Sequence, residues 1–524
     1  MDRIGVFFME RSIMQSRKRF TVWCALPVAV LCSALAGCIV GPKYSPPTIT
    51  APPVYKESPA QFGEIGEWTV AKPQDAVLRG KWWEIYNDPD LNALEDQLNI
   101  DNQNIRQAFE NFMQARALVR EARSQYFPTV GVGGSYTRSR TSSNVGSKSS
   151  TGGTSGQQTQ VFSFPADVSW EPDLWGRVRN TVRAGQYTAQ LTAADLENER
   201  LTEQASLAEY FFEIRGQDAL QKILNDTVDA DRKALEAVTA AYDTGVGDRI
   251  SVVEAQTTLE SAQSAAINLR IARAQYEHAI AMLTGKPAST FSIPVEPKTS
   301  APPPIPVGLP SQLLERRPDI AAAERNMAAA NAQIGVAYAA FYPALTFSAS
   351  GGVESSAIKH ILDWPSRFWS IGPSISETVY DGGLRRATVN QYIATYNGNV
   401  AAYRQSVLTA FQQVEDALAT VGILSQQIRR QQEAVDSSQT FLRLELGRYE
   451  TGIDPYIDVV IAQTTLLGNR QSLTILQVQQ MTASVQLIES LGGGWDRSQL
   501  PTPAQVTQAP PKSTTMMSGT ASQH

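Results

Sequence analysis

The stretch YDTGVGDRISVVEAQTTLE at residues 242–260 occurs a second time, as YETGIDPYIDVVIAQTTLL at residues 449–467. The two stretches are 207 residues apart and identical at 11 of 19 positions. The glycines that close the segments behind them, Gly285 and Gly492, keep the same offset. Self-similarity at a fixed offset indicates a duplicated structural unit. We therefore expect residues 91–285 and 311–495 to be two copies of one unit, related by an internal two-fold repeat.

Each copy shows the same predicted order: a helix, two strands, a very long helix and a further helix. In the first copy we expect helices over 92–126, 177–242 and 249–285, because proline is absent from residues 173–286 and Gly245 breaks the pattern. In the second copy the first helix begins at Pro318, a favourable first helical position. A helix of 66 residues is about 100 Å long at 1.5 Å per residue. Such helices cannot be buried in one compact core, so they must line a tube or pack against other chains.

The predicted strands alternate strictly between apolar and polar residues. This pattern is typical of outer-membrane β-barrel strands, which turn apolar side chains to lipid and polar ones to the lumen. A water-soluble sheet with one buried face would give the same alternation. The four segments are Thr129–Thr137, Val161–Trp170, Leu345–Val353 and Trp369–Ile375.

Four strands cannot close a barrel, and open sheet edges are not tolerated in lipid. Several copies of the chain must therefore pool their strands. Two copies would give about 8 strands and three would give about 12, and only the larger number leaves room for a solute path.

The N-terminus has the features of a bacterial lipoprotein signal. Arg17, Lys18 and Arg19 precede the uncharged run 20–37, and Leu35-Ala36-Gly37-Cys38 resembles a lipobox. We expect residues 1–37 to be removed and Cys38 to be lipidated. The alternative is an uncleaved anchor with an incidental cysteine. Residue 39 is isoleucine and not aspartate, which favours export to the outer membrane.

Composition excludes several classes of function. The chain has 524 residues, 45 basic against 51 acidic, and a net charge of −6, so nucleic acid is not an expected partner. Its three cysteines all lie in the first 38 residues, and its three histidines are far apart. A Cys- or His-based metal site is therefore not expected. Gly285-Lys286 lacks the upstream glycine of a P-loop, and no G-x-S-x-G occurs. We expect no enzyme activity and no cofactor.

Several short motifs, in their order along the chain, carry a family resemblance. Over residues 35–495 the sequence resembles the TolC-like outer membrane factors, specifically the NodT/OprM-type lipoproteins. The motifs are LAGCIVGPKY from Leu35, Trp82-Trp83 with DPDL from Asp88, WEPDLWGR from Trp170, LERRPDI from Leu314 and YDGG from Tyr380.

The resemblance implies an architecture and a function. The architecture is a homotrimer with a 12-stranded β-barrel in the outer membrane, continued by an α-helical periplasmic barrel. Residues 38–90 and 286–310 would build an equatorial belt, and the tail 496–524 is expected to be disordered. The function would be passive conduction of drugs or other small molecules, with a periplasmic adaptor (membrane fusion) protein and an inner-membrane pump of the resistance-nodulation-division type as partners. Alternatives are a duct for type I secretion or oligosaccharide export, and a non-conducting coiled-coil lipoprotein scaffold.

The resemblance places a periplasmic gate where the helix pairs turn. Asp458 matches the first of two tip aspartates of TolC-type channels, while the second falls on Ile461. A ring of Asp458 would constrict the lumen electrostatically, and a ring of Ile461 would close it by dewetting. Glu254, at the position in copy one that matches Ile461, is an alternative source of the missing acid. Asp458 is also explained as an acid that stabilises a helix N-terminus. Ile457 matches an apolar constriction residue of OprM-type tips, and Tyr456 and Ser251 complete the candidate gate.

The same turns are the expected docking site for the adaptor. They leave little side chain at the tip, so a partner could approach the backbone. Glycine is also what a turn with positive φ requires. The candidate docking residues are Thr244, Gly245, Gly247, Thr451 and Gly452.

Overall fold

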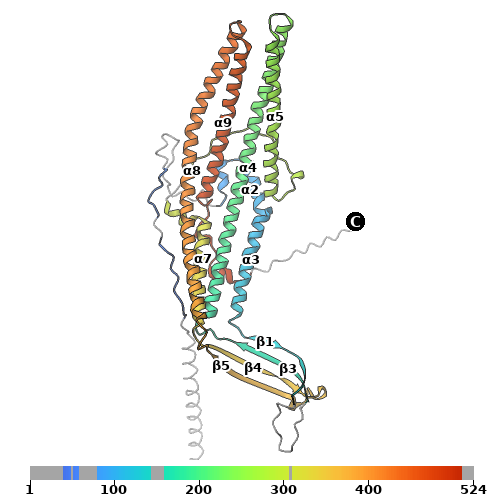
Figure 1. Ribbon diagram of the computed structural model, residues 1–524, viewed down its shortest axis with the longest axis vertical. Coiled ribbons are helices and arrows are strands. Elements are labelled where there is room, and N and C mark those ends of the chain that lie inside the picture. Colours follow the sequence, from blue (N-terminus) through green and yellow to red (C-terminus); the bar gives the residue numbers. More distant parts are fainter. Residues whose placement is uncertain (1–38, 49–50, 58–79, 143–157, 306–309, 510–524) are drawn as a thin grey trace, which may run out of the picture.

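The computed structural model of the chain describes residues 39–48, 51–57, 80–142, 158–305 and 310–509. The molecule is elongated, with a bundle of long helices and an antiparallel sheet at one end (Figure 1). Two helical hairpins turn at the end opposite the sheet. None of the described helices combines the length and the apolar character that crossing a bilayer requires.

The two hairpins have matching lengths. Helix α4 (Arg177–Asp243) continues into α5 (Arg249–Leu283), and α8 (Leu384–Glu450) continues into α9 (Tyr456–Ser490). Both α4 and α8 have 67 residues, and both α5 and α9 have 35. A helix of 67 residues is about 100 Å long. The hairpin helices α4 and α5 lie within two residues of the predicted ranges.

The first predicted helix, 92–126, is wrong as a single element, because it breaks at Asn102. The structure has α2 (Pro89–Asp101) and α3 (Gln103–Ser124) instead. Oδ1 of Asn102 accepts hydrogen bonds from the backbone N–H groups of Asn104 at 2.9 Å and Ile105 at 3.0 Å, which caps α3. Its Nδ2 donates to the carbonyl of Leu283 at 3.0 Å. A tertiary contact with the end of α5 therefore fixes the break. Helix α7 (Pro318–Ala339) has 22 residues, as α3 does. It begins at the predicted proline and packs against α4 and α8.

The sheet is antiparallel throughout its described strands. They are β1 (Thr129–Val132), β2 (Ser135–Arg140), β3 (Gln158–Trp170), β4 (Ala344–Ser355) and β5 (Arg367–Ser376). Both β1 and β2 pair with β3, which pairs with β4, which pairs with β5.

The first predicted strand is interrupted at Gly133 and Gly134. Val132 pairs with Ala166 and Ser135 pairs with Ser163, so β1 and β2 keep one register along β3. A Cβ on Gly134 would lie 3.0 Å from the ring of Phe164, which shows how closely the chain passes that side chain. Four strand paths therefore remain, although five strands are present among the described residues.

One face of the sheet is apolar across all four paths. Residues directly opposite each other in antiparallel strands share a face. Val130 lies opposite Val168, which lies opposite Ala349, which lies opposite Ile371. Val130 is 70% exposed and Ile371 is 76% exposed. We call this the apolar sheet face. Val168 and Ala349 are half-buried, so no element of this chain fully covers the face among the described residues.

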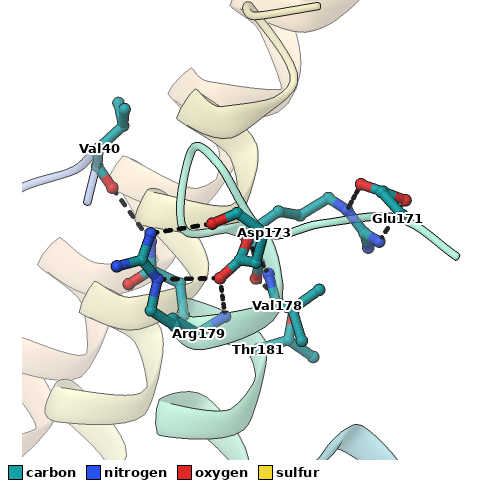
Figure 2. Close-up of polar contacts among 8 residues, drawn as sticks. Val40, Glu171, Asp173, Val178, Arg179 and Thr181 are labelled. Atoms are coloured by element: carbon teal, nitrogen blue, oxygen red, sulfur yellow. Dashed lines mark hydrogen bonds and ion pairs between the residues drawn. The ribbon is translucent and has the colours of Figure 1, made fainter. Parts of the chain in front are cut away.

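The long helix α4 begins in a polar network next to the sheet (Figure 2). The carboxylate of Asp173 accepts hydrogen bonds from the N–H groups of Val178 at 3.0 Å and Arg179 at 2.9 Å. It also accepts from Nε of Arg179 at 3.0 Å. An acid at a helix N-terminus satisfies free N–H groups and favours the helix dipole. The WEPDLWGR motif is thus the start signal for α4.

The described N-terminal segment is attached at the same place. Ile39 packs against Gly176, whose added Cβ would lie 3.2 Å from Cα of Ile39. The carbonyl of Val40 accepts a hydrogen bond from Nδ2 of Asn180 at 3.0 Å (Figure 2). Cys38 lies outside the described residues. Its neighbour Ile39 is held where the sheet meets the helices.

The largest core lies along the helices and takes side chains from both predicted belt segments. Trp82 and Trp83 of η3 (Trp82–Tyr86) are buried in it, as are Ile293 and Ile305. Asp218 of α4 connects this helix to α5 and to the segment that contains Glu296. Its carboxylate pairs with Nε of Arg273 at 2.6 Å and accepts a hydrogen bond from the N–H of Glu296 at 2.9 Å.

The tail expected to be disordered is folded over residues 496–509. It forms η8 (Arg497–Gln499) and α10 (Pro503–Thr507). Val506 is fully buried against Ala115, Val119 and Ala189. Arg116 donates hydrogen bonds to the carbonyls of Gln505 and Gln508. The prediction failed because these partners are remote in the sequence, and residues 510–524 lie outside the described part.

Short elements elsewhere are η4 (Ala288–Thr290), η5 (Pro310–Gln312), α6 (Leu313–Arg316), η6 (Ile358–His360) and η7 (Trp364–Ser366).

Candidate functional site at the helical tips

The two helical tips end their long helices in the same way. Gly245 and Gly452 have φ of 80° and 75°. The N–H of the residue after each glycine bonds back into the helix, from Val246 to the carbonyl of Ala241 at 3.0 Å and from Ile453 to that of Arg448 at 2.9 Å. This is the left-handed glycine stop of an α-helix.

The predicted docking residues lie on open surface. A Cβ added to Gly245 or Gly452 would meet nothing within 4 Å. Thr244 and Thr451 are exposed, and their hydroxyls bond to the carbonyls of Ala240 and Gly447 at 3.1 and 3.0 Å. Positive φ alone therefore requires the glycines, and the backbone beside them is accessible to a partner.

Gly247 has a different role from the other two glycines. A Cβ there would lie 3.0 Å from the backbone nitrogen of Tyr242. Glycine is thus needed for close packing inside the first turn. At the offset of 207 residues, the second turn has Asp454 in its place.

Asp454 belongs to a charged cluster that only the second tip has. Nη2 of Arg448 lies 2.8 Å from Oδ1 of Asp454, and Nε of Arg448 bonds to Oδ2. Carboxylate oxygens of Glu445, Asp454 and Asp458 lie within 4.8 Å of one another. We call Glu445, Arg448, Asp454 and Asp458 the tip cluster. At the same offset the first tip has Val238, Ala241, Gly247 and Ser251.

Opposing shifts in pKa accompany this crowding. Desolvation raises the pKa of the Glu445 carboxyl, and its hydrogen bond and repulsion with Asp454 raise it further. The hydrogen bond from Arg448 lowers the pKa of Asp454. The positive charge of Arg448 offsets part of the repulsion among the three acids.

Helix α9 presents two different faces at the tip. Tyr456 and Val459 are buried, whereas Ile457 is 39% and Ile461 is 51% exposed. Asp458 lies between these faces, half-buried in the first turn of α9. Its N–H bonds to the carbonyl of Pro455 at 3.2 Å. The structure thus brings Ile457, Asp458 and Ile461 to one end of the second hairpin.

Tyr456 lies in the core between the hairpins and does not line an open surface. It packs with Val238 and Ala255, and its ring meets that of Tyr449 edge-on with centroids 5.4 Å apart. Burial, with the neighbouring charge of Asp231, raises the pKa of Tyr456 to about 12. Tyr456 therefore acts on the tip through packing.

Glu254 and Ser251 lie on α5 of the first hairpin, whereas the residues of the tip cluster lie on the second. Glu254 is half-buried near Tyr456, whose pKa its charge helps to raise. Ser251 is in the first turn of α5, where its N–H bonds to Oδ1 of Asp248 at 2.7 Å. Within one chain, Glu254 does not join Asp458 and Ile461.

Sequence reasoning missed Glu445, Arg448 and Asp454. It used the identities between the two copies and passed over their differences. The signal was available, because all three charged residues replace uncharged ones at an offset of 207.

Comparison with known proteins identifies the family. The family model described as outer membrane efflux protein matches residues 94–286 and 309–493. The chain belongs to the outer membrane efflux protein family. The two matched ranges correspond to the two halves that each end in one hairpin.

Relatives within this family are efflux components. The chain is 31% identical over 466 residues to the solvent efflux pump outer membrane protein SrpC of Pseudomonas putida, covering 89% of this chain and 97% of that protein. It is 29% identical over 479 residues to the probable efflux pump outer membrane protein TtgC of Pseudomonas putida, covering 90% and 95%. Its fold matches that of the outer-membrane channel OprN with a TM-score of 0.77 and 26% identity, covering 87% of this chain and all of the other.

Proposed function

We propose that this chain is the outer-membrane channel of a tripartite efflux system, conducting small molecules passively and gated at the helical tips. The observation that carries the proposal is the apolar sheet face, which continues across β1, β3, β4 and β5 and is exposed. A face of this kind is suited to contact with lipid tails. Membership of the efflux family supports the same conclusion.

Closure of the barrel requires further copies of the chain. The described sheet has two free edges, β1 with β2 on one side and β5 on the other. Lipid does not tolerate unpaired edges. Three chains would supply 12 strand paths, enough for an open lumen. In the same homotrimer the helices would form a periplasmic barrel about 100 Å long. The two halves, 91–285 and 311–495, would be its repeated units.

The N-terminus would be a lipid anchor at Cys38, exposed once the signal 1–37 is removed. Ile39 is held against Gly176 at the start of α4, close to the ends of the strands. An acyl chain on the preceding residue would therefore begin at the membrane surface. The segments 38–90 and 286–310 would form the equatorial belt, which their shared core supports.

The gate would be built from the second hairpin. Repeated around a three-fold axis, Asp458 would form an acidic ring, and the exposed Ile457 and Ile461 would form an apolar constriction beside it. Glu254 and Ser251 would line the gate from the neighbouring hairpin, and Tyr456 would support it from the core. The adaptor would dock at Thr244, Gly245, Gly247, Thr451 and Gly452.

Conductance of the purified, lipidated protein in planar bilayers tests this function. We expect small, mostly closed channels that open when Asp458 is replaced by alanine. A non-conducting scaffold would give no current with either protein. Export of oligosaccharide or protein, the alternative transport roles, would be separated by deleting the gene and measuring drug accumulation in cells, which would then remain unchanged.

A further inference from the structure

Three arginines surround an open depression where the helices meet the sheet. It has a volume of about 550 Å³ and lies between the end of α3, the start of α4 and α10. Arg123, Arg179 and Arg183 line it together with Tyr126, and Pro503 and Thr507 form a wall. We call it the basic depression.

Two of these arginines have no carboxylate partner among the described residues. Arg179 pairs with Asp173 at 3.0 Å. For Arg123 and Arg183, both exposed, no ion pair occurs in the part of the chain that the structure describes. All three guanidinium groups are near Tyr126: burial and Asp173 raise the pKa of its hydroxyl, and the three arginines oppose that rise. The positive charges of the three arginines are therefore concentrated around Tyr126.

The basic depression lies directly beside the aromatic end of the sheet. Tyr126 is three residues before β1, and its carbonyl accepts a hydrogen bond from Nε1 of Trp170 at 3.0 Å. Trp170 closes β3 and stacks on Phe347 with centroids 5.9 Å apart. Tyrosine and tryptophan gather at the level of lipid headgroups. Arg123 is in the last turn of α3, and its carbonyl accepts a hydrogen bond from the N–H of Tyr126 at 3.1 Å.

We propose that the basic depression binds the phosphate of an anionic phospholipid headgroup. The proposal rests on the proposed function, because it needs the apolar sheet face to lie in the membrane. Guanidinium groups bind phosphate oxygens with paired hydrogen bonds. The neighbouring apolar sheet face would take the acyl chains, which a free phosphate lacks. The folded tail, through α10, contributes to the site.

Native mass spectrometry of the full-length, detergent-solubilised protein tests the proposal. The probes are dioleoyl phosphatidylglycerol, dioleoyl phosphatidylcholine and inorganic phosphate. The test protein is the double variant Arg123→Gln with Arg183→Gln. The matched control is Arg270→Gln with Arg429→Gln, which removes two exposed arginines remote from the sheet. We expect phosphatidylglycerol to bind at least tenfold more tightly than phosphatidylcholine, and the test variant alone to lose that preference.

Equal binding of both lipids, or unchanged preference in the test variant, overturns the proposal. Displacement of the lipid by millimolar inorganic phosphate would assign the site to free phosphate instead, and so overturn it too. Thermal unfolding of both double variants shows whether they fold. Conductance of the same preparations keeps the two proposals apart: a protein that conducts but shows no lipid preference contradicts only this one, and a protein that does not conduct contradicts the proposed function.

Discussion

The guanidinium of Arg448 binds the carboxylate of Asp454 across the turn between α8 and α9. Nη2 lies 2.8 Å from Oδ1, and Nε bonds to Oδ2. The last turn of α8 is thereby tied to the loop that leads into the candidate gate residues. In the first hairpin the corresponding residues are Ala241 and Gly247, so that turn has no such tie.

Removing the ion pair between Arg448 and Asp454 should make the channel open more often. We expect Asp454→Asn to increase the open probability several-fold in planar bilayers, because Arg448 loses its charged partner and the turn its restraint. The pair is exposed on the arginine side, and exposed ion pairs contribute little to stability, so global unfolding should hardly change. Arg443→Gln, an exposed arginine on α8, is the control. If the wild type, Asp454→Asn and Arg443→Gln all conduct equally, the Arg448–Asp454 ion pair does not restrain the gate.

The tip cluster should make gating depend on pH. The raised pKa of Glu445 means that its contribution to the closed tip is complete at low pH and is lost as pH rises through that pKa. The lowered pKa of Asp454 gives the reverse, a contribution lost only as pH falls through it. Open probability should therefore be lowest between these two values. In Glu445→Gln the rise on the alkaline side should disappear. A profile that stays the same in this variant would refute the assignment.

Asp458 and Ile461 make separable predictions. If an acidic ring constricts the lumen, Asp458→Ala should raise conductance and the uptake of bulky antibiotics. If dewetting closes the gate, Ile461→Asn should open it more than Asp458→Ala does. Single-channel recordings of both variants decide between the two. If Asp458→Ala shows wild-type conductance and uptake, Asp458 does not constrict the lumen. Its remaining role is then to stabilise the start of α9.

Glu95 of α2 should cost stability at neutral pH. Its carboxyl is fully buried, and neither oxygen has a hydrogen-bond partner among the described residues. Burial, and then repulsion by Asp96, raise its pKa well above the ordinary value. Stability is thus full below the ordinary pKa and falls as pH rises towards the raised one. We expect Glu95→Gln to unfold at a higher temperature than the wild type at pH 8, with little difference at pH 4. Glu110→Gln, at an exposed position, serves as the control. If Glu95→Gln is less stable than the wild type at both pH values, the Glu95 carboxyl stabilises the fold, which would contradict this prediction.

Asp218 should contribute strongly to the stability of the region where residues 286–305 pack against the helices. It is 2% exposed and pairs with Arg273, so its removal leaves this partly buried cation with only Glu277, at 3.4 Å, as a carboxylate partner. We expect Asp218→Ala to lower the free energy of unfolding by about 3 kcal/mol, the lower end for a broken buried pair. Asp226→Ala, which breaks an exposed pair with Lys222, should cost about 1 kcal/mol or less. Similar losses from both in chemical denaturation would contradict this difference.

Long elements were predictable from the sequence because their signals are local. The proline-free run and the left-handed Gly245 set the limits of α4 to within one residue. Strict alternation located all four strand paths. The break at Asn102 was not predictable in this way, because the carbonyl of Leu283 that holds it comes from another helix. The fold of the tail likewise depends on how Val506 fits against Ala115 and Ala189.

The candidate site was predictable only in part. The family resemblance pointed to Ile457 and Ile461, which are exposed, and the offset of 207 residues located both tips. It could not show that Tyr456 is buried, because its partner Val238 lies in the other hairpin. Differences between the copies, such as Asp454 in place of Gly247, carry the charged chemistry and need the structure to bring them together.

The mass of the purified, detergent-solubilised assembly tests most directly that several chains complete one channel. Multi-angle light scattering, corrected for bound detergent, should give three times the mass of one lipidated chain, at every protein concentration that can be measured. A stable single subunit that stays soluble without detergent would contradict the account, because the apolar sheet face and the free edges of β1 and β5 would then have no membrane and no neighbour to cover them.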